Sequence, residues 1–125
     1  MTIVWVGLGG CLGSIARYLL SGLVQSRAGA AFPFGTLAVN IAGCFAMGAV
    51  SELAESYAFL SPQARAFIAI GVLGGFTTFS AFGNETLNLA RDGERGLAFG
   101  NVAAHLVFAL GAVWLGRMTV HGLWK

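Results

Sequence analysis

Gly74-Gly75-Phe76-Thr77-Thr78-Phe79-Ser80-Ala81-Phe82 places three hydroxyl groups and three aromatic rings inside the third of four long apolar stretches. Paired glycines and adjacent threonines weaken the continuity of a helix. A break in a membrane helix frees backbone carbonyl groups, which then need protein, water or an ion as a partner. Broken helices of this kind are typical of ion sites. The motif therefore predicts a break in the third helix, with a permeation site beside it.

The overall composition predicts an integral membrane protein. Of the 125 residues, 57% are hydrophobic and 10% are charged, and a soluble domain of this size cannot bury so much apolar surface. About 20 apolar residues cross the roughly 30 Å of hydrocarbon in a bilayer. Runs of that length lie at residues 3–23, 32–53, 64–89 and 97–120. We therefore expect an all-α membrane protein, in which residues 1–125 form a single domain of four transmembrane helices.

Basic residues are balanced between the two sides of the membrane. An even number of spans places both termini and the second connector on one side. That side carries Arg65, Arg117 and Lys125, and the other side carries Arg27, Arg91 and Arg95. Orientation normally follows an excess of Lys and Arg on one side, and this chain has none. The balance predicts a dual-topology, antiparallel homodimer with its twofold axis in the membrane plane. The alternative is that features other than this count fix the orientation.

Polar groups within the spans favour an anion. Arg17 lies well inside the first span and Asn40 about a third of the way through the second, while the middle of the first, second and fourth spans contains no carboxylate. Polar groups at such depth are costly and are therefore candidates for function. The alternatives are that Arg17 anchors the helix by reaching the interface, and that Asn40 makes an ordinary hydrogen bond between helices.

The aromatic residues of the third span form a ridge. Phe76, Phe79 and Phe82 recur every three residues, and a helix places such residues near one another on its surface. The edge of an aromatic ring carries the positive lobe of its quadrupole, so edges turned toward a pore favour a small anion. The alternative is that these rings only pack helices together.

The chain resembles the Fluc (CrcB) fluoride channels of bacteria along essentially its full length. Motifs in three of the four spans carry the resemblance, in the expected order. They are Gly9-Gly10-Cys11-Leu12-Gly13-Ser14-Ile15-Ala16-Arg17-Tyr18, Gly35-Thr36-Leu37-Ala38-Val39-Asn40-Ile41-Ala42-Gly43, and the Gly74 to Phe82 run quoted above.

This resemblance implies a passive and highly selective fluoride channel in the bacterial inner membrane. The implied assembly is an antiparallel homodimer with two pores that both subunits line. The weak acid HF enters a cell uncharged and dissociates there, so a channel that lets the anion leave gives fluoride resistance. The implied partners are fluoride, membrane lipid and a second copy of the chain, with no nucleic acid.

The resemblance also implies roles for individual residues. Phe79 and Phe82 correspond to the paired pore phenylalanines whose ring edges face the ion, and Asn40 to the amide that donates to it. Gly74 and Thr77 correspond to positions whose backbone carbonyl groups, from both subunits, hold one structural Na⁺ ion at the dimer centre.

Four further residues complete the implied site. Arg17 resembles the arginine of the vestibule, and Glu85 the carboxylate one helical turn beyond the second pore phenylalanine. Thr78 and Ser80 are expected to contribute hydroxyl groups to the pore.

The fourth span departs from the family pattern. Family members tend to carry hydroxyl residues along this helix, whereas an ungapped comparison places Ala109 and Val113 there, and Ala81 replaces a usual Thr in the third span. Asn101 and His105 lie one turn apart on one face and are candidates to supply donors instead. His105 has two interpretations: a pore-lining residue, or a neutral imidazole bonded to a neighbouring helix.

Two other classes of protein remain as alternatives. A small multidrug-resistance-type exporter also has four short helices, but its proton-coupled exchange needs a carboxylate within the first span, where this chain has none. A non-transporting membrane scaffold would use the Phe and Gly motifs for packing alone. An enzyme is not expected, because the two His and two Cys residues show no nucleophile, base or zinc spacing.

Overall fold

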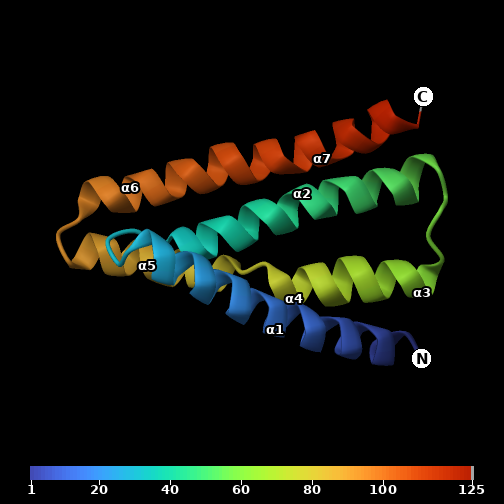
Figure 1. The fold of residues 1–125 in the computed structure, drawn as a ribbon, viewed down its shortest axis with the longest axis horizontal. Helices are drawn as coiled ribbons and strands as arrows, with labels where there is room; N and C mark the ends of the chain where they lie inside the picture. Colours follow the sequence, from blue (N-terminus) through green and yellow to red (C-terminus); the bar gives the residue numbers. More distant parts are fainter. Residues whose placement is uncertain (125) are drawn as a thin grey trace.

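Four long helices run side by side in the computed structural model, which describes residues 1–124 (Figure 1). The first and second are α1 (Thr2–Ala28) and α2 (Phe34–Ser56). Both ends of the chain lie at the same end of the molecule, as an even number of spans requires (Figure 1). Lys125, one of the six basic residues counted above, lies outside the described residues.

The third and fourth long helices are each built from several segments. The third consists of α3 (Pro62–Arg65), the π-helical η1 (Ala66–Leu73), α4 (Gly74–Phe76) and α5 (Phe79–Arg91). The fourth consists of α6 (Arg95–Ala104), the π-helical η2 (His105–Ala109) and α7 (Leu110–Leu123). All four long helices are long and apolar enough to cross a membrane. Each extends beyond the range expected from the sequence at one end or at both.

Small residues allow the helices to pack closely in two pairs. The first helix packs on η1 and α4, and α2 packs on α7. A Cβ atom added at Gly13 would collide with the carbonyl oxygen of Val72, and one added at Gly116 would collide with that of Phe45. Membrane helices associate through such close backbone approach, because the lipid removes the hydrophobic drive for association.

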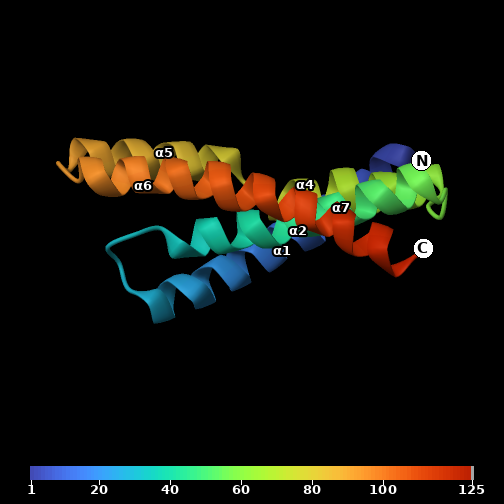
Figure 2. The ribbon, with the colours of Figure 1, turned by 90° about the horizontal axis from the view of Figure 1, so that it is seen from above.

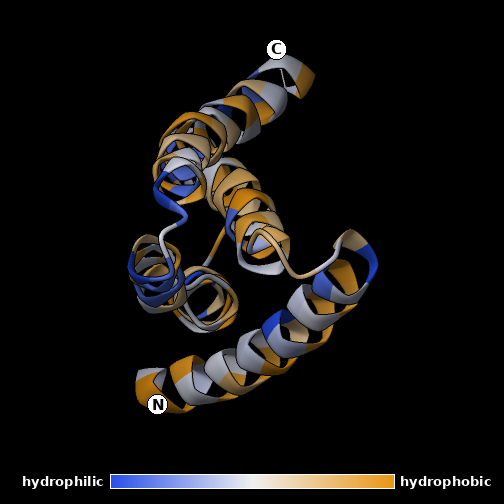
Figure 3. Ribbon diagram, turned by 90° about the vertical axis from the view of Figure 1, so that its left-hand side faces the viewer, coloured by the Kyte–Doolittle hydropathy of each residue, from blue (hydrophilic) through white to orange (hydrophobic). Residues whose placement is uncertain are grey.

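The helices form an open arc when the molecule is seen from one end (Figure 3). Figure 2 shows α5 and α6 side by side, while α1 diverges from them toward the connector between α1 and α2. Large apolar side chains remain exposed along the helices, and Phe79 is 83% exposed. A single copy therefore leaves extensive apolar surface for lipid or for another chain to cover.

Candidate functional site

The third long helix breaks at the two threonines of the motif. Thr77 and Thr78 have extended backbones, with φ/ψ of −88°/158° and −151°/110°. The hydroxyl of Thr77 donates to the Leu73 carbonyl oxygen at 3.0 Å, and the hydroxyl of Thr78 accepts from the Ala81 N–H at 3.1 Å. These two side chains satisfy the helix ends on either side of the break. Gly74 and the residue after it remain helical within α4, so the interruption begins three residues after the first glycine.

The amide of Asn40, on α2, holds the break from a neighbouring helix. Its Oδ1 accepts from the Thr78 N–H at 2.8 Å, and its Nδ2 donates to the Thr78 carbonyl oxygen at 3.1 Å. The second N–H of the same amide points to His105 Nε2, 3.1 Å away. Asn40 is buried, with 7% of its surface exposed. The amide oxygen and both N–H groups of Asn40 therefore have partners within the protein.

His105, at the start of η2, is fixed by the helix that carries it. Its Nδ1 lies 3.0 Å from the Asn101 carbonyl oxygen, which can only accept a hydrogen bond. The proton of the neutral ring therefore sits on Nδ1, and Nε2 is left as the acceptor that faces Asn40. The imidazole thus bonds to a neighbouring helix, and the same ring also lines the cavity beside the break, so His105 has the contacts that both interpretations require. In this arrangement Nε2 accepts a hydrogen bond and does not donate one.

The side chain of Asn101, whose backbone carbonyl binds His105, makes hydrogen bonds on the side away from the break. Its Nδ2 donates to the Thr86 hydroxyl at 2.9 Å, and that hydroxyl donates to the Phe82 carbonyl oxygen at 2.7 Å. Asn101 is fully buried, and its Oδ1 has no hydrogen-bonding partner among the described residues. The side-chain N–H of Asn101 is thus used by the Thr86 hydroxyl on α5.

The two phenylalanines predicted to line the pore lie directly after the break. The ring centroids of Phe79 and Phe82 are 5.3 Å apart, and those of Phe82 and His105 are 4.3 Å apart. A cavity of about 300 Å³ contacts these three rings and Asn40; its lining is Asn40, Cys44, Thr77, Thr78, Phe79, Phe82, His105, Leu106, Ala109 and Leu110. The amide, the imidazole and the aromatic rings therefore share one space, and no residue with a permanent charge borders it.

A second cavity, of about 250 Å³, lies on the other side of Thr78. Arg17 and Glu85 both line it, with Thr36 between them in the sequence. The Thr36 hydroxyl donates to Glu85 Oε1 at 2.7 Å, while Oε2 is buried without a partner among the described residues. No ion pair joins Arg17 to a carboxylate within the described part of the chain. The Ser80 hydroxyl is 3.2 Å from that of Thr78, and Ser80 is exposed.

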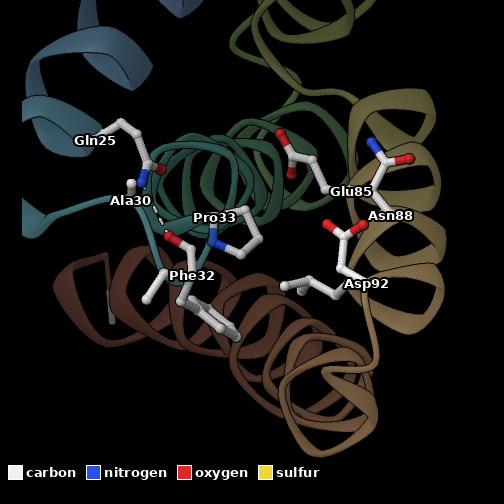
Figure 4. A pocket seen from close by; sticks show the side chains of 9 residues that line it. Gln25, Ala30, Phe32, Pro33, Glu85, Asn88 and Asp92 are labelled. Carbon is white, nitrogen blue, oxygen red and sulfur yellow. Dashed lines mark hydrogen bonds between the residues drawn. The ribbon is translucent and has the colours of Figure 1, made fainter.

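A third cavity, of about 340 Å³, opens at the end of the molecule where α1 and α2 are connected. Figure 4 shows the side chains of Glu85 and Asn88 on α5, and of Asp92 directly after α5, on the side of the cavity opposite Gln25 and the connector. Glu85 borders both this cavity and the second one, and Thr78 borders both the second and the first. The three cavities therefore lie next to one another between this end of the molecule and the phenylalanines.

Sequence reasoning missed two hydroxyl groups near these cavities: Thr36 lines the second cavity, and Thr86 lines none of the three but bonds to Asn101. Thr36 lies one turn before Asn40, so both face the third long helix, and this spacing of four residues was a usable signal. Thr86 lies four residues after Phe82 on α5 and receives the bond from Asn101. Its only sequence signal was its position on a helix rich in polar residues.

The residues proposed for a sodium ion lie at the end of α4. The Thr78 N–H donates to Asn40 Oδ1 and not to the Gly74 carbonyl oxygen, which would accept it in a continuous helix. The Gly74 carbonyl is therefore released, and Gly74 is exposed. Carbonyl oxygens are suitable ligands for such a cation at a broken helix, so these residues fit the ion. No cluster of His, Cys, Asp and Glu side chains that could hold a metal ion occurs in residues 1–124.

Comparisons with known proteins agree on one family. Residues 4–117 match the family model described as "CrcB-like protein, Camphor Resistance (CrcB)". A protein of Opitutus terrae named "Fluoride-specific ion channel FluC" is 49% identical, over 96% of this chain and 92% of the relative. Proteins with the same name from Sorangium cellulosum and a Geobacter species are each 46% identical, over 95% and 97% of this chain and 94% and 98% of the relatives.

Proposed function

This chain belongs to the CrcB-like protein family, and on that premise we propose that it is a passive, fluoride-selective ion channel. Relatives at 44–49% identity carry the name of a fluoride-specific ion channel. In the bacterial inner membrane, such a channel lets fluoride leave the cytoplasm and so gives fluoride resistance. The protein is thus a transporter without catalytic chemistry.

The observation that carries this proposal is the cavity beside the helix break. Phe79 and Phe82 line it together with the Asn40 amide. Fluoride is small and strongly hydrated, so a selective pore must be narrow and must replace lost water with donors and positive ring edges. A cavity without a permanent charge provides such contacts without holding the ion too tightly. Thr78, within the break, and Ser80, directly after it, would add hydroxyl donors.

Charged groups lie along the approach to this cavity. Arg17 lines the second cavity, which we propose is the vestibule, and its positive charge would raise the local concentration of an anion there. Glu85 lies between the vestibule and the outermost cavity. Its hydrogen bond from Thr36 orients the carboxylate. We propose that this carboxylate is a pore-associated charge.

We further propose that two copies assemble as an antiparallel, dual-topology homodimer with two pores. Phe79 is 83% exposed in a single copy, so its ring needs a second chain to close a dry passage around an ion. The balanced count of basic residues supports insertion in both orientations. The large apolar side chains that a single copy leaves exposed support the same assembly, because a partner would cover them.

A structural Na⁺ ion at the dimer centre completes the proposal. The carbonyl oxygens of Gly74 and Thr77 would hold it, from both subunits. The ion would neutralise the partial negative charges that the helix break gathers at the interface. The residues of the break would thereby be kept in one conformation.

The test is a flux measurement on purified protein in liposomes. Liposomes loaded with fluoride are diluted into fluoride-free buffer, and a fluoride electrode follows the release; chloride-loaded liposomes are the control. Rapid loss of fluoride without loss of chloride is expected. Absence of fluoride release would reject the channel in favour of a scaffold, and equal release of chloride would reject the selectivity.

A further inference from the structure

The Asn40 amide uses its three hydrogen bonds in two different ways. Two of them pair its Oδ1 and Nδ2 with the N–H and carbonyl oxygen of Thr78. If the amide were turned over, its NH₂ would face the Thr78 N–H and its oxygen would face the Thr78 carbonyl oxygen. Thr78 alone therefore fixes the orientation of the amide. The third bond, to His105 Nε2, is not needed for this purpose.

That third N–H is the only donor of the Asn40 amide that a permeating anion could use without undoing the break. It lies in the cavity that Phe79 and Phe82 also line. Donation to an ion requires that the N–H leave His105 Nε2, 3.1 Å away. In the ion-free protein this donor is therefore already occupied.

The orientation of the His105 ring allows Nε2 to accept the hydrogen bond from Asn40. Its Nδ1 proton is committed to the Asn101 carbonyl oxygen on the preceding turn, and its ring lies against Phe82 on α5. His105 itself is 9% exposed. Across the cavity, α2 presents Asn40 and the thiol of Cys44, and the remaining lining side chains are not ionisable. The bare lone pair on Nε2 is thus fixed at hydrogen-bonding distance from the amide.

We propose that His105 is a positioning residue that holds the Asn40 N–H between ions and yields it to each passing fluoride. A buried donor without an acceptor is unfavourable, so the ion-free passage needs a substitute for the anion. A charged acceptor forms a stronger hydrogen bond than a neutral one, so fluoride displaces the imidazole. When the ion leaves, the imidazole returns. This competition weakens fluoride binding and speeds fluoride release. The inference rests on the proposed channel function.

Two substitutions separate this role from a purely structural one. His105→Leu removes the acceptor, while His105→Gln places an amide oxygen near the position of Nε2. Without the competing acceptor, fluoride should bind more tightly. The flux of His105→Leu should then saturate at a fluoride concentration about two- to tenfold lower, the range that one hydrogen bond supports, with a lower maximal flux. His105→Gln should keep the half-saturating concentration of the wild type.

The matched control is His121→Gln, at the far end of the fourth long helix. This variant should leave the half-saturating fluoride concentration and the maximal flux unchanged.

The measurement is the initial rate of fluoride release from liposomes over a series of internal fluoride concentrations. If the wild type conducts and His105→Leu keeps its half-saturating concentration, the inference is overturned while the channel function stands. If the wild type does not conduct, the proposed function itself fails.

A spectroscopic readout does not depend on flux or on the folding of a variant. In the wild-type protein labelled with ¹⁵N at histidine, His105 should show the neutral form protonated at Nδ1. Its Nε2 signal should shift when fluoride is added, because the hydrogen bond from Asn40 is lost, and chloride should cause no shift. A His105 Nε2 signal that is indifferent to saturating fluoride would also overturn the inference.

Discussion

Replacing Asn40 with Asp should abolish conduction while changing the shape of the side chain very little. The carboxylate keeps one contact, because an oxygen still accepts from the Thr78 N–H. At the position of Nδ2, however, an oxygen would face the Thr78 carbonyl oxygen and His105 Nε2, each 3.1 Å from the amide nitrogen in the wild type. Two attractive contacts become contacts between acceptors.

The size of this effect follows from two contributions. Each lost hydrogen bond that leaves a buried group without a partner costs about 1–3 kcal/mol, so the break should be destabilised by about 2–6 kcal/mol. Two negative charges separated by about 5 Å repel one another by about 3 kcal/mol at an effective dielectric constant of about 20. Since every 1.4 kcal/mol is a factor of ten, this repulsion alone lowers fluoride occupancy by about a hundredfold.

The assay combines fluoride release from liposomes with thermal unfolding in detergent. Asn84→Asp is the matched control, because Asn84 is exposed and lies on α5, beyond the break. We expect the control to conduct like the wild type, and Asn40→Asp to release fluoride at least a hundred times more slowly. An Asn40→Asp protein that conducts within a factor of ten of the wild type would refute this account of the amide.

Three further predictions concern the ring, the ion and the packing. Phe82→Ile should lower the fluoride flux by at least about tenfold, because its ring edge is lost, while the dimer persists on size-exclusion chromatography; undiminished flux would contradict a role in the pore. Prolonged incubation in sodium-free buffer should cause the dimer to dissociate, since the carbonyl groups of Gly74 and Thr77 lose their ion, and a dimer indifferent to sodium would remove that site. Gly116→Ala should destabilise the protein by about 1–3 kcal/mol, because the new methyl collides with the backbone of α2, whereas Gly100→Ala meets no atom within 4 Å and should not; equal melting temperatures would contradict the packing.

Those structural elements that depend only on local composition could be predicted from the sequence. Apolar runs predicted the four long helices, because length and hydropathy alone decide whether a helix can span a bilayer. The paired glycines and the adjacent threonines together predicted the break in the third helix, but the break lies at the threonines and Gly74 stays helical. Glycine lowers helix stability by only about 1 kcal/mol, and the tight contact of α4 with α1 offsets this cost.

The partners of the site residues could not be predicted in the same way. Asn40 and His105 are separated by 65 positions, and no periodicity within one helix shows that their side chains meet. The tautomer of His105 depends in turn on a backbone carbonyl group on the preceding turn, which became evident only when the ring orientation was known. Sequence patterns place a residue on a face, whereas the contact depends on how two faces are aligned.

The dependence of the break on Asn40 has a consequence for how the protein is made. The amide lies 38 positions before the backbone that it holds, on a helix that enters the membrane earlier. The third long helix carries the threonine side chains that cap its own two ends, but it lacks the partner for the Thr78 backbone when it first leaves the translocation machinery. It should insert as a nearly continuous rod and kink only after it docks beside its predecessor, so that the conducting shape arises late in biogenesis.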